Sequence, residues 1–160
     1  LTLEQMRQEL RREMVASRMV ERVIAAIPTH AEHINARHIL LSTQEEAERV
    51  LAQLQAGSDF AALAQRYSQD TYTRDRGGDL GYVPRGILTS PEVEEAAFAL
   101  QPGQISGVIH SALGYHIVQV VDRVPDQEIS AENLRLLRDR AVREWLDGLR
   151  QQADIQIFVP

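Results

Sequence analysis

The chain has 160 residues, 44% of them apolar and 25% charged, which is typical of a globular chain and excludes a disordered one. Its 17 basic residues, all of them Arg, and 23 acidic residues give a net charge of −6, which argues against general binding of nucleic acid. The sequence contains no Cys, which excludes thiol catalysis, Cys-containing zinc sites and a disulfide framework.

Residues 1–34 are predicted to form a long amphipathic helix that ends before Pro28. Thr2 and Gln5 have the spacing of a capping box, and apolar residues then recur near helical spacing. The sequence contains no run of 18 apolar residues that could span a membrane as a helix. Because the chain starts without an initiator Met or a signal-peptide pattern, we expect any signal peptide or membrane anchor to lie outside these 160 residues.

Residues 35–124 are predicted to alternate short strands with helices. The apolar pattern and the caps predict, in chain order, a strand at 36–41, helices at 43–57, 59–67 and 90–100, and strands at 105–110 and 115–122. The stretch 68–81 is polar and contains Gly77 and Gly78, so we expect it to be a loop.

Residues 125–160 are predicted to form a second long helix, with Ser130 as its N-cap, followed by a short strand at 155–159. Both outer helices are too amphipathic to be stable alone in water, so each needs the other, the middle segment or further sequence. All three Met residues of the chain, Met6, Met14 and Met19, lie in the first helix. They either pack against the last helix or form an adaptable binding surface, because Met is flexible and polarizable.

Two of the five His residues lie on apolar faces of predicted strands. Alternation places His38 on the same face as Leu40, and His116 on the same face as Val118 and Val120. By residue type alone, the simplest interpretation is that both are core histidines with satisfied hydrogen bonds. A zinc site is the alternative, but no third ligand stands at a motif spacing such as H-E-x-x-H.

The glycine-containing stretch 67–81 does not have the pattern of a phosphate-binding or calcium-binding loop. It lacks the P-loop motif with its Lys, and Asp70, Asp75 and Asp79 do not follow the spacing of an EF-hand. The G-x-S-x-G motif of a nucleophilic serine is also absent from the chain, and Ser111 is typical of a turn. Residue types alone therefore favour a turn scaffold.

Five short motifs occur in order along the middle segment. They are Ala36-Arg37-His38-Ile39-Leu40, the stretch from Phe60 to Tyr67-Ser68-Gln69-Asp70, Gly77-Gly78-Asp79-Leu80-Gly81, Ala97-Phe98-Ala99-Leu100 and Gly114-Tyr115-His116-Ile117. In this order and spacing they resemble the parvulin family of peptidyl-prolyl cis–trans isomerases. The resemblance covers residues 35–124, and the combination is far more specific than any one motif.

The resemblance implies an α+β fold with a parvulin-like four-stranded antiparallel sheet wrapped by helices, flanked by N- and C-terminal helices. It implies catalytic roles for His38, Asp70, His116 and Ser111. It also implies a substrate-binding pocket formed by Leu80, Leu88, Val93, Phe98 and Leu113. Because the X–Pro bond is twisted rather than broken, this activity requires no metal, cofactor or nucleophile.

Two features of the sequence bear on activity and substrate. Val93 stands where many active parvulins present a Phe to the proline ring, so we expect a shallower pocket and weaker activity. Parvulins that prefer phosphorylated Ser or Thr before Pro use a basic loop after the first strand, whereas the stretch 41–46 is short and acidic. The resemblance therefore implies substrates without phosphate.

The segments 1–34 and 125–160 flank the predicted isomerase domain at 35–124, and this arrangement resembles SurA- and PrsA-type extracytoplasmic foldases. In those proteins, N- and C-terminal segments join into a chaperone module. The resemblance implies an isomerase that acts on unfolded or proline-containing client polypeptides outside the cytoplasm. The alternatives are a holdase chaperone whose parvulin domain is weakly active or inactive, and a structural piece that forms a homodimer by exchanging its helices.

Overall fold

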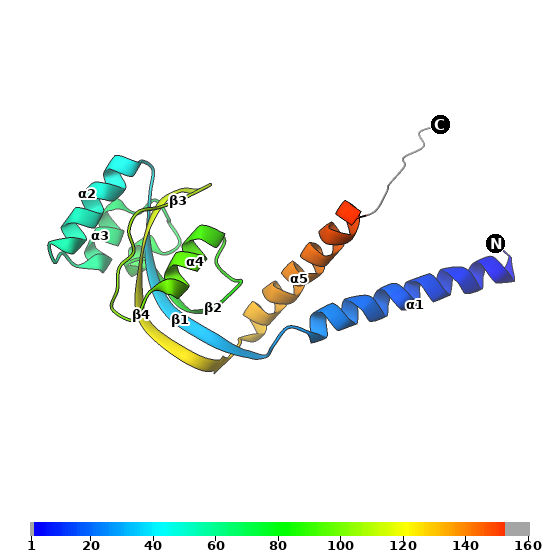
Figure 1. The fold of residues 1–160 in the computed structure, drawn as a ribbon. Coiled ribbons are helices and arrows are strands. Elements are labelled where there is room, and N and C mark those ends of the chain that lie inside the picture. Colours follow the sequence, from blue (N-terminus) through cyan, green and yellow to red (C-terminus); the bar gives the residue numbers. More distant parts are fainter. Residues whose placement is uncertain (1, 153–160) are drawn as a thin grey trace, which may run out of the picture. The chain divides into compact units, whose positions relative to one another are not determined.

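The computed structural model describes residues 2–152, so the strand predicted at 155–159 lies outside the described residues. The elements follow in the order α1 (Leu3–Ala25), β1 (His30–Leu41), α2 (Gln44–Gln55), α3 (Phe60–Tyr67), the 3₁₀-helix η1 (Arg74–Arg76), β2 (Asp79–Pro84), α4 (Pro91–Ala99), β3 (Ile109–Ser111), β4 (Gly114–Glu128) and α5 (Ala131–Gln152) (Figure 1). The chain divides into a unit of residues 30–128 and a unit of residues 1–29 and 129–160.

The unit of residues 30–128 is built on a four-stranded antiparallel sheet in the order β2-β1-β4-β3. The central strands β1 and β4 pair from His30 opposite Glu128 to Leu41 opposite Tyr115. This long pairing carries the unit beyond the range 35–124 that the sequence indicated. The predicted α+β class, with a four-stranded antiparallel sheet flanked in sequence by N- and C-terminal helices, is confirmed.

The strand predicted at 105–110 is wrong in its bounds, because the structure has a strand only at Ile109–Ser111. The Ser106 N–H donates to the carbonyl of Val118 at 2.8 Å, and the Ser106 hydroxyl accepts from the Val118 N–H at 2.9 Å. A side-chain oxygen thus stands where a backbone carbonyl would accept in a regular ladder. Local bonds of this kind compete with strand formation, and the regular ladder is interrupted here.

Strand β2 begins inside the stretch 68–81 that was predicted to be a loop. Its Gly81 and Pro84 are both residues that strands disfavour, which is why the apolar pattern gave no strand signal. Pro84 is tolerated because β2 is an edge strand of the sheet, so the missing N–H interrupts no ladder on the outer side. The prediction of a loop to residue 81 is therefore wrong at its C-terminal end.

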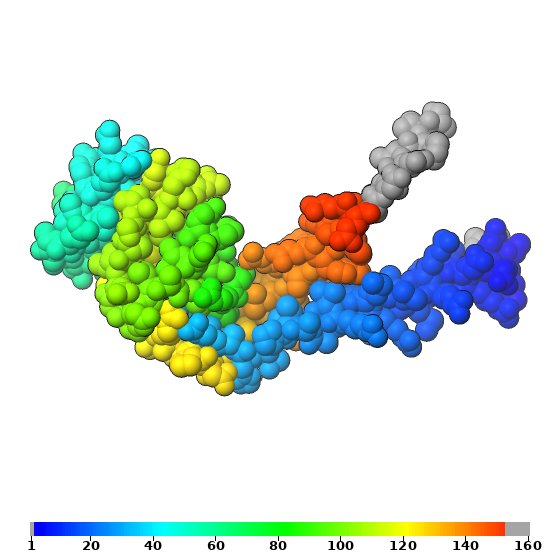
Figure 2. All heavy atoms as spheres, in the orientation of Figure 1, coloured from blue at the N-terminus to red at the C-terminus, as the bar shows by residue number. Residues whose placement is uncertain are grey.

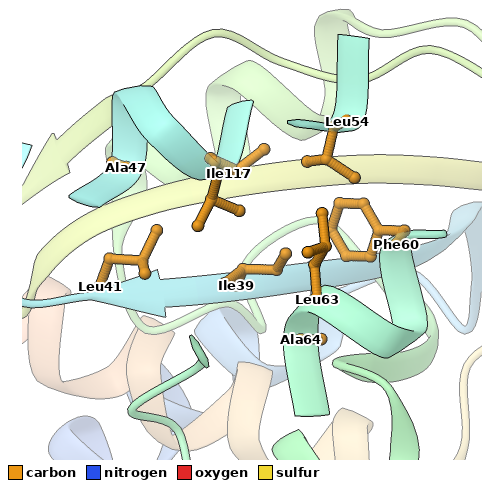
Figure 3. Close-up of a cluster of buried hydrophobic side chains, with 9 residues drawn as sticks. Ile39, Leu41, Ala47, Leu54, Phe60, Leu63, Ala64 and Ile117 are labelled. Atoms are coloured by element: carbon orange, nitrogen blue, oxygen red, sulfur yellow. The ribbon is translucent and has the colours of Figure 1, made fainter. Parts of the chain in front are cut away.

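Buried apolar side chains cover both faces of the sheet. Ile117 of β4 packs with α2 and α3, whereas Val118 packs with α4, because successive side chains of a strand point to opposite faces. Figure 3 shows Ile117 near Ile39 of β1 and Leu63 of α3 in the first of these clusters. The sheet is therefore enclosed between two helical layers.

Side-chain caps fix the starts of four helices. Thr2, Thr43, Asp59 and Ser130 each accept a hydrogen bond from a backbone N–H in the first turn. Thr2 forms the complete capping box that the sequence predicted, whereas at Thr43 only the side-chain hydroxyl caps the helix. Ser90 occupies the N-cap position of α4 but makes no side-chain cap bond, so its hydroxyl does not serve the helix.

The unit of residues 1–29 and 129–160 contains α1 and α5, which contact each other. Neither helix has a buried residue. The large apolar side chains exposed along α1 are Leu3, Met6, Leu10, Met14, Val15 and Met19. Figure 2 shows the visible surface of the N-terminal part of α1, in dark blue, uncovered by other atoms. The Met residues therefore lie at the surface of the described chain.

No helix within residues 2–152 has both the length and the apolar character needed to cross a membrane.

Candidate active site

His38, in β1, is held by hydrogen bonds from the loop that follows α3. Its Nε2 lies 2.8 Å from Asp70 Oδ2 and 3.1 Å from Thr73 Oγ1. The loop is tied to β1 at Leu40, whose carbonyl accepts from the loop backbone at 2.7 Å and whose N–H donates to the Ser68 hydroxyl at 3.1 Å. These bonds bring Asp70 to a histidine that lies 32 positions earlier in the sequence.

The turn after η1 brings the start of β2 against the backbone of His38. Gly78 has a φ of 78°, in the left-handed region, and its carbonyl accepts the N–H of His38 at 2.9 Å. A Cβ atom at position 78 would overlap the carbonyl oxygen of His38. Only Gly combines this backbone conformation with such a close approach. Gly78 therefore allows the close spacing between this turn and the backbone of His38.

The carboxylate of Asp70 is kept ionised by the hydrogen bonds that it accepts. Burial raises the pKa of Asp70, but bonds from the Thr73 hydroxyl, from His38 and from the Tyr72 N–H lower it, and the pKa lies below its ordinary value. With the carboxylate ionised, we assign the proton of the His38–Asp70 bond to His38 Nε2, which leaves Nδ1 of that ring as an acceptor.

His116 of β4 lies beside His38, with the two rings stacked at a centroid distance of 5.9 Å. Its Nε2 lies 2.7 Å from the hydroxyl oxygen of Ser111, while its buried Nδ1 has no hydrogen-bond partner. The Ser111 oxygen also accepts from the N–H of Leu113 at 3.1 Å. Ser111 therefore links the ring of His116 to the backbone of the turn between β3 and β4.

Burial keeps the imidazole of His116 neutral. It lowers the pKa of His116 to about 4, and the neighbouring His38 acts in the same direction, while Glu92 and Asp70 oppose the shift. At neutral pH the site therefore combines an uncharged His116 with the ionised carboxylate of Asp70.

The depressed pKa of His116 predicts a pH-dependent contribution to stability. Between pH 4 and 6.5 the unfolded chain binds a proton at this ring that the folded chain does not. The free energy of unfolding therefore rises with pH through that window, and the destabilisation from this ring is largest below pH 4. Urea unfolding at several pH values should show a shallower rise for His116→Asn than for the wild type. His110→Asn, at an exposed position, should keep the wild-type rise, and equal slopes in all three proteins would contradict the prediction.

A cavity of about 430 Å³ opens beside the two histidines, a size typical of sites for small ligands or single side chains. It is lined by His38, Leu40, Asp70, Tyr72, Thr73, Leu80, Leu88, Thr89, Ser90, Val93, Leu113 and His116. Most of the lining surface is apolar, and three of its polar residues, Asp70, Thr73 and His116, lie beside His38. The cavity can therefore enclose an apolar ring while placing a polar amide against hydrogen-bonding groups.

The structure brings together most of the residues that the sequence predicted for the site. His38, Asp70, His116, Leu80, Leu88, Val93 and Leu113 line the cavity. Ser111 lies behind His116 and is bonded to it. Phe98 does not line the cavity: it is buried in the cluster beneath α4, with the guanidinium of Arg85 4.2 Å from its ring centroid.

Several lining residues were missed by the sequence analysis. They are Leu40, Tyr72, Thr73, Thr89 and Ser90. Leu40 could have been found, because strand alternation places it on the same face as His38. The others lie in irregular segments, where no periodicity indicates the direction of a side chain. Thr73 is the most consequential omission, since its hydroxyl contacts both Asp70 and His38.

The side chains around the cavity do not form a metal site. Within residues 2–152, no three His, Asp or Glu residues come together in a way that could hold a metal ion. Among the described lining residues, Asp70 supplies the one carboxylate, and its oxygens already accept bonds from Thr73, His38 and Tyr72. The groups present offer hydrogen bonds, a fixed negative charge and apolar surface.

Comparison with known proteins decides the family. The model of the rotamase family, described as the PPIC-type PPIase domain, matches residues 36–122. This chain belongs to that family. The matched range includes every residue that lines the cavity, and it confirms the resemblance to parvulins that the five motifs indicated.

Relatives of known name are foldases and chaperones, as the flanking helices indicated. The chain is 41% identical over 133 residues to the foldase protein PrsA of Caldanaerobacter subterraneus subsp. tengcongensis, covering 79% of this chain and 43% of that protein. It is 31% identical over 157 residues to the chaperone SurA of Thiobacillus denitrificans, covering 90% of this chain and 35% of that protein. A crystal structure of the peptidylprolyl isomerase PrsA from Bacillus anthracis superposes with a TM-score of 0.64 at 30% identity, covering 88% of this chain and 71% of that one. The chain spans about two fifths of the length of the PrsA relatives that it matches.

Proposed function

We propose that the unit of residues 30–128 catalyses cis–trans isomerisation of X–Pro peptide bonds in unfolded polypeptide chains. The observation that carries this proposal is the apolar cavity with His116 and the bonded pair of His38 and Asp70 on its polar side. Membership of the PPIC-type family supports it.

The chemistry requires binding rather than bond breaking. Rotation about an X–Pro bond is opposed by a barrier of about 18–20 kcal/mol, which reflects the loss of amide resonance. In the twisted state the nitrogen regains its lone pair and the charge distribution differs from that of both planar isomers. A site that binds this state more tightly than either isomer accelerates the interconversion without forming a covalent intermediate.

The apolar wall and the polar side of the cavity have separate tasks in this reaction. Leu80, Leu88 and Val93 form apolar surface that can hold the proline ring and exclude water from the amide. His116 contributes an uncharged ring to the cavity lining, and Ser111 and the stacked ring of His38 hold it in place. Fixed groups of this kind in a dry site stabilise a changed charge distribution without reorganising.

Asp70 acts through His38 rather than on the substrate. Its oxygens accept bonds from Thr73, Tyr72 and His38, so both oxygens are engaged within the protein. The carboxylate fixes the tautomer and orientation of His38, which stacks on His116. Asp70 is therefore a positioning and electrostatic residue in the proposed mechanism.

The rim of the cavity favours substrates with an apolar residue beside the proline. Tyr72 is 88% exposed and Leu113 is 59% exposed, and both line the cavity. Exposed apolar side chains at a binding site are suited to contacts with a partner that buries them. The described lining contains no Arg, so nothing there would pair with a phosphate group.

An isomerase assay on short peptides tests this proposal. The wild-type chain should accelerate the cis-to-trans conversion of a Leu-Pro peptide, and do so less for a phosphoserine-Pro peptide, because Asp70 and the apolar rim disfavour an added negative charge. An Ala-Pro peptide is the control for the size of the preceding residue. Rates equal to the uncatalysed rate for every peptide, even at micromolar protein, would overturn the proposed function.

The exposed face of α1 favours chaperone activity as a second function. Met6, Leu10 and Met14 are each at least half exposed, and a flexible apolar surface of this kind can bind varied unfolded chains. In that reading the clients are polypeptides outside the cytoplasm. We also propose that the protein forms a homodimer through α1 and α5, and that a membrane anchor lies outside these 160 residues. Protection of a denatured client from aggregation that persists in Asp70→Asn, and is lost with Leu10→Ser and Met14→Ser together, would support it.

A further inference from the structure

The segment between β2 and α4 forms one wall of the cavity without regular secondary structure. Leu88, Thr89 and Ser90 of this segment line the cavity. A wall of irregular backbone keeps its place only if its polar groups find partners, because free backbone groups favour water.

One carboxylate oxygen of α4 holds this segment. Glu94 Oε2 accepts the N–H of Gly86 at 2.8 Å and the N–H of Leu88 at 3.2 Å. Both donors belong to the wall, and Leu88 itself contacts the cavity. Glu94 directly follows Val93, which lines the cavity from α4, so the helix and the wall are joined at the site.

The same helix holds the wall at a second point. The guanidinium of Arg85 lies over the ring of Phe98, 4.2 Å from its centroid. Phe98 lies four residues after Glu94, which is about one turn along the same side of α4. Ile87, between the two attachment points, packs against the buried cluster under the helix. The segment is therefore fastened to α4 by a charged acceptor, an aromatic ring and an apolar contact.

We propose that Glu94 is a positioning residue that holds Leu88 over the substrate proline; this inference rests on the proposed isomerase function. Without the carboxylate, the N–H groups of Gly86 and Leu88 turn to water and the wall moves outward. The contact between Leu88 and the proline ring is made equally in the planar and twisted states. Its loss therefore weakens binding of both and raises KM more than it lowers kcat. The network of His38 and Asp70 is left intact.

The test compares Glu94→Ala with Glu94→Gln and with the matched control Glu95→Ala, which removes an exposed carboxylate from the next position of the same helix. Amide hydrogen exchange measured by NMR should be faster at Gly86 and Leu88 in Glu94→Ala only. Steady-state assays on a Leu-Pro peptide should show KM raised about threefold to tenfold in that variant, with kcat nearly unchanged. Glu94→Gln keeps a carbonyl acceptor, so its amide exchange rates and its KM should both lie close to the wild-type values.

The outcomes separate this inference from the proposed function. Unchanged exchange at Gly86 and Leu88 in Glu94→Ala would overturn the inference and leave the isomerase proposal standing. Faster exchange with unchanged KM would also overturn it, because the wall would then not contact the substrate. An inactive wild type would overturn the proposed function and with it the catalytic part of the inference. Spectra of residues outside the segment report whether each variant is folded, and Glu94→Gln provides a second test should Glu94→Ala unfold.

Discussion

Replacing Asp70 with Asn should lower kcat/KM on a Leu-Pro peptide by about tenfold to a hundredfold. The substitution keeps the size of the side chain but removes its charge. Hydrogen bonds to charged groups contribute about 1.5–3 kcal/mol, and each 1.4 kcal/mol corresponds to a factor of ten in rate. The loss should appear in kcat, because the carboxylate acts on the histidine pair and not on binding of the proline ring.

The physical reason lies in the tautomer of His38. The ionised carboxylate requires a proton on His38 Nε2, whereas the Asn amide can present either a carbonyl or an NH₂ group to that nitrogen. The orientation of His38 against His116 is then no longer fixed. NMR signals of the two imidazoles should report this change directly, through altered shifts of the ring nitrogens in Asp70→Asn.

Asp75→Asn is the matched control for this prediction. Asp75 lies in η1 close to Asp70 in sequence, but its side chain is 81% exposed and pairs with Arg74 at the surface. An exposed pair of this kind contributes little, so activity and ring shifts should stay at the wild-type values. If Asp70→Asn retained full activity, or if Asp75→Asn lost as much, the assigned role of Asp70 would be wrong.

The histidine pair was predictable because it follows the simplest rule in the chain. A strand alternates its side chains, so His38 and His116 had to share faces with apolar neighbours in β1 and β4. What alternation could not give was the partner across the fold. Asp70 reaches His38 only because Ser68 and Leu40 tie an irregular loop to β1, and such loops carry no periodic signal. The family motifs supplied this link, and composition alone favoured a turn scaffold.

Phe98 shows that a motif can identify a residue correctly without indicating the direction of its side chain. Val93 and Phe98 are both buried residues of α4, yet five positions along a helix rotate the side chain by about 140°. Val93 can therefore reach the cavity while Phe98 packs beneath the helix and meets Arg85. Leu88 lies in a segment without a period, and its position depends on the bonds to Glu94.

Gly78→Ala should be among the most destabilising single substitutions in the unit of residues 30–128. The new methyl group would overlap the carbonyl oxygen of His38, and the φ of 78° is unfavourable for Ala. The conformation costs about 1–2 kcal/mol, and relief of the overlap by backbone movement costs about 1–3 kcal/mol more. Urea unfolding should therefore show a loss of roughly 2–5 kcal/mol.

Gly57→Ala separates the two parts of this effect. Gly57 also has a positive φ, 92°, but a Cβ there would meet no atom within 4 Å. This control should lose only about 1–2 kcal/mol, the cost of the backbone conformation. Equal losses in the two variants would show that the contact with His38 contributes nothing to stability.

The overlap also predicts a loss of activity that the control does not share. The Gly78 carbonyl accepts the N–H of His38, so a methyl group that pushes the two backbones apart displaces the ring held by Asp70. Assayed at a temperature where both variants are folded, Gly78→Ala should show a lower kcat and Gly57→Ala the wild-type value. The Gly-Gly turn would then be required for the position of a catalytic side chain, and not only for the path of the chain between η1 and β2.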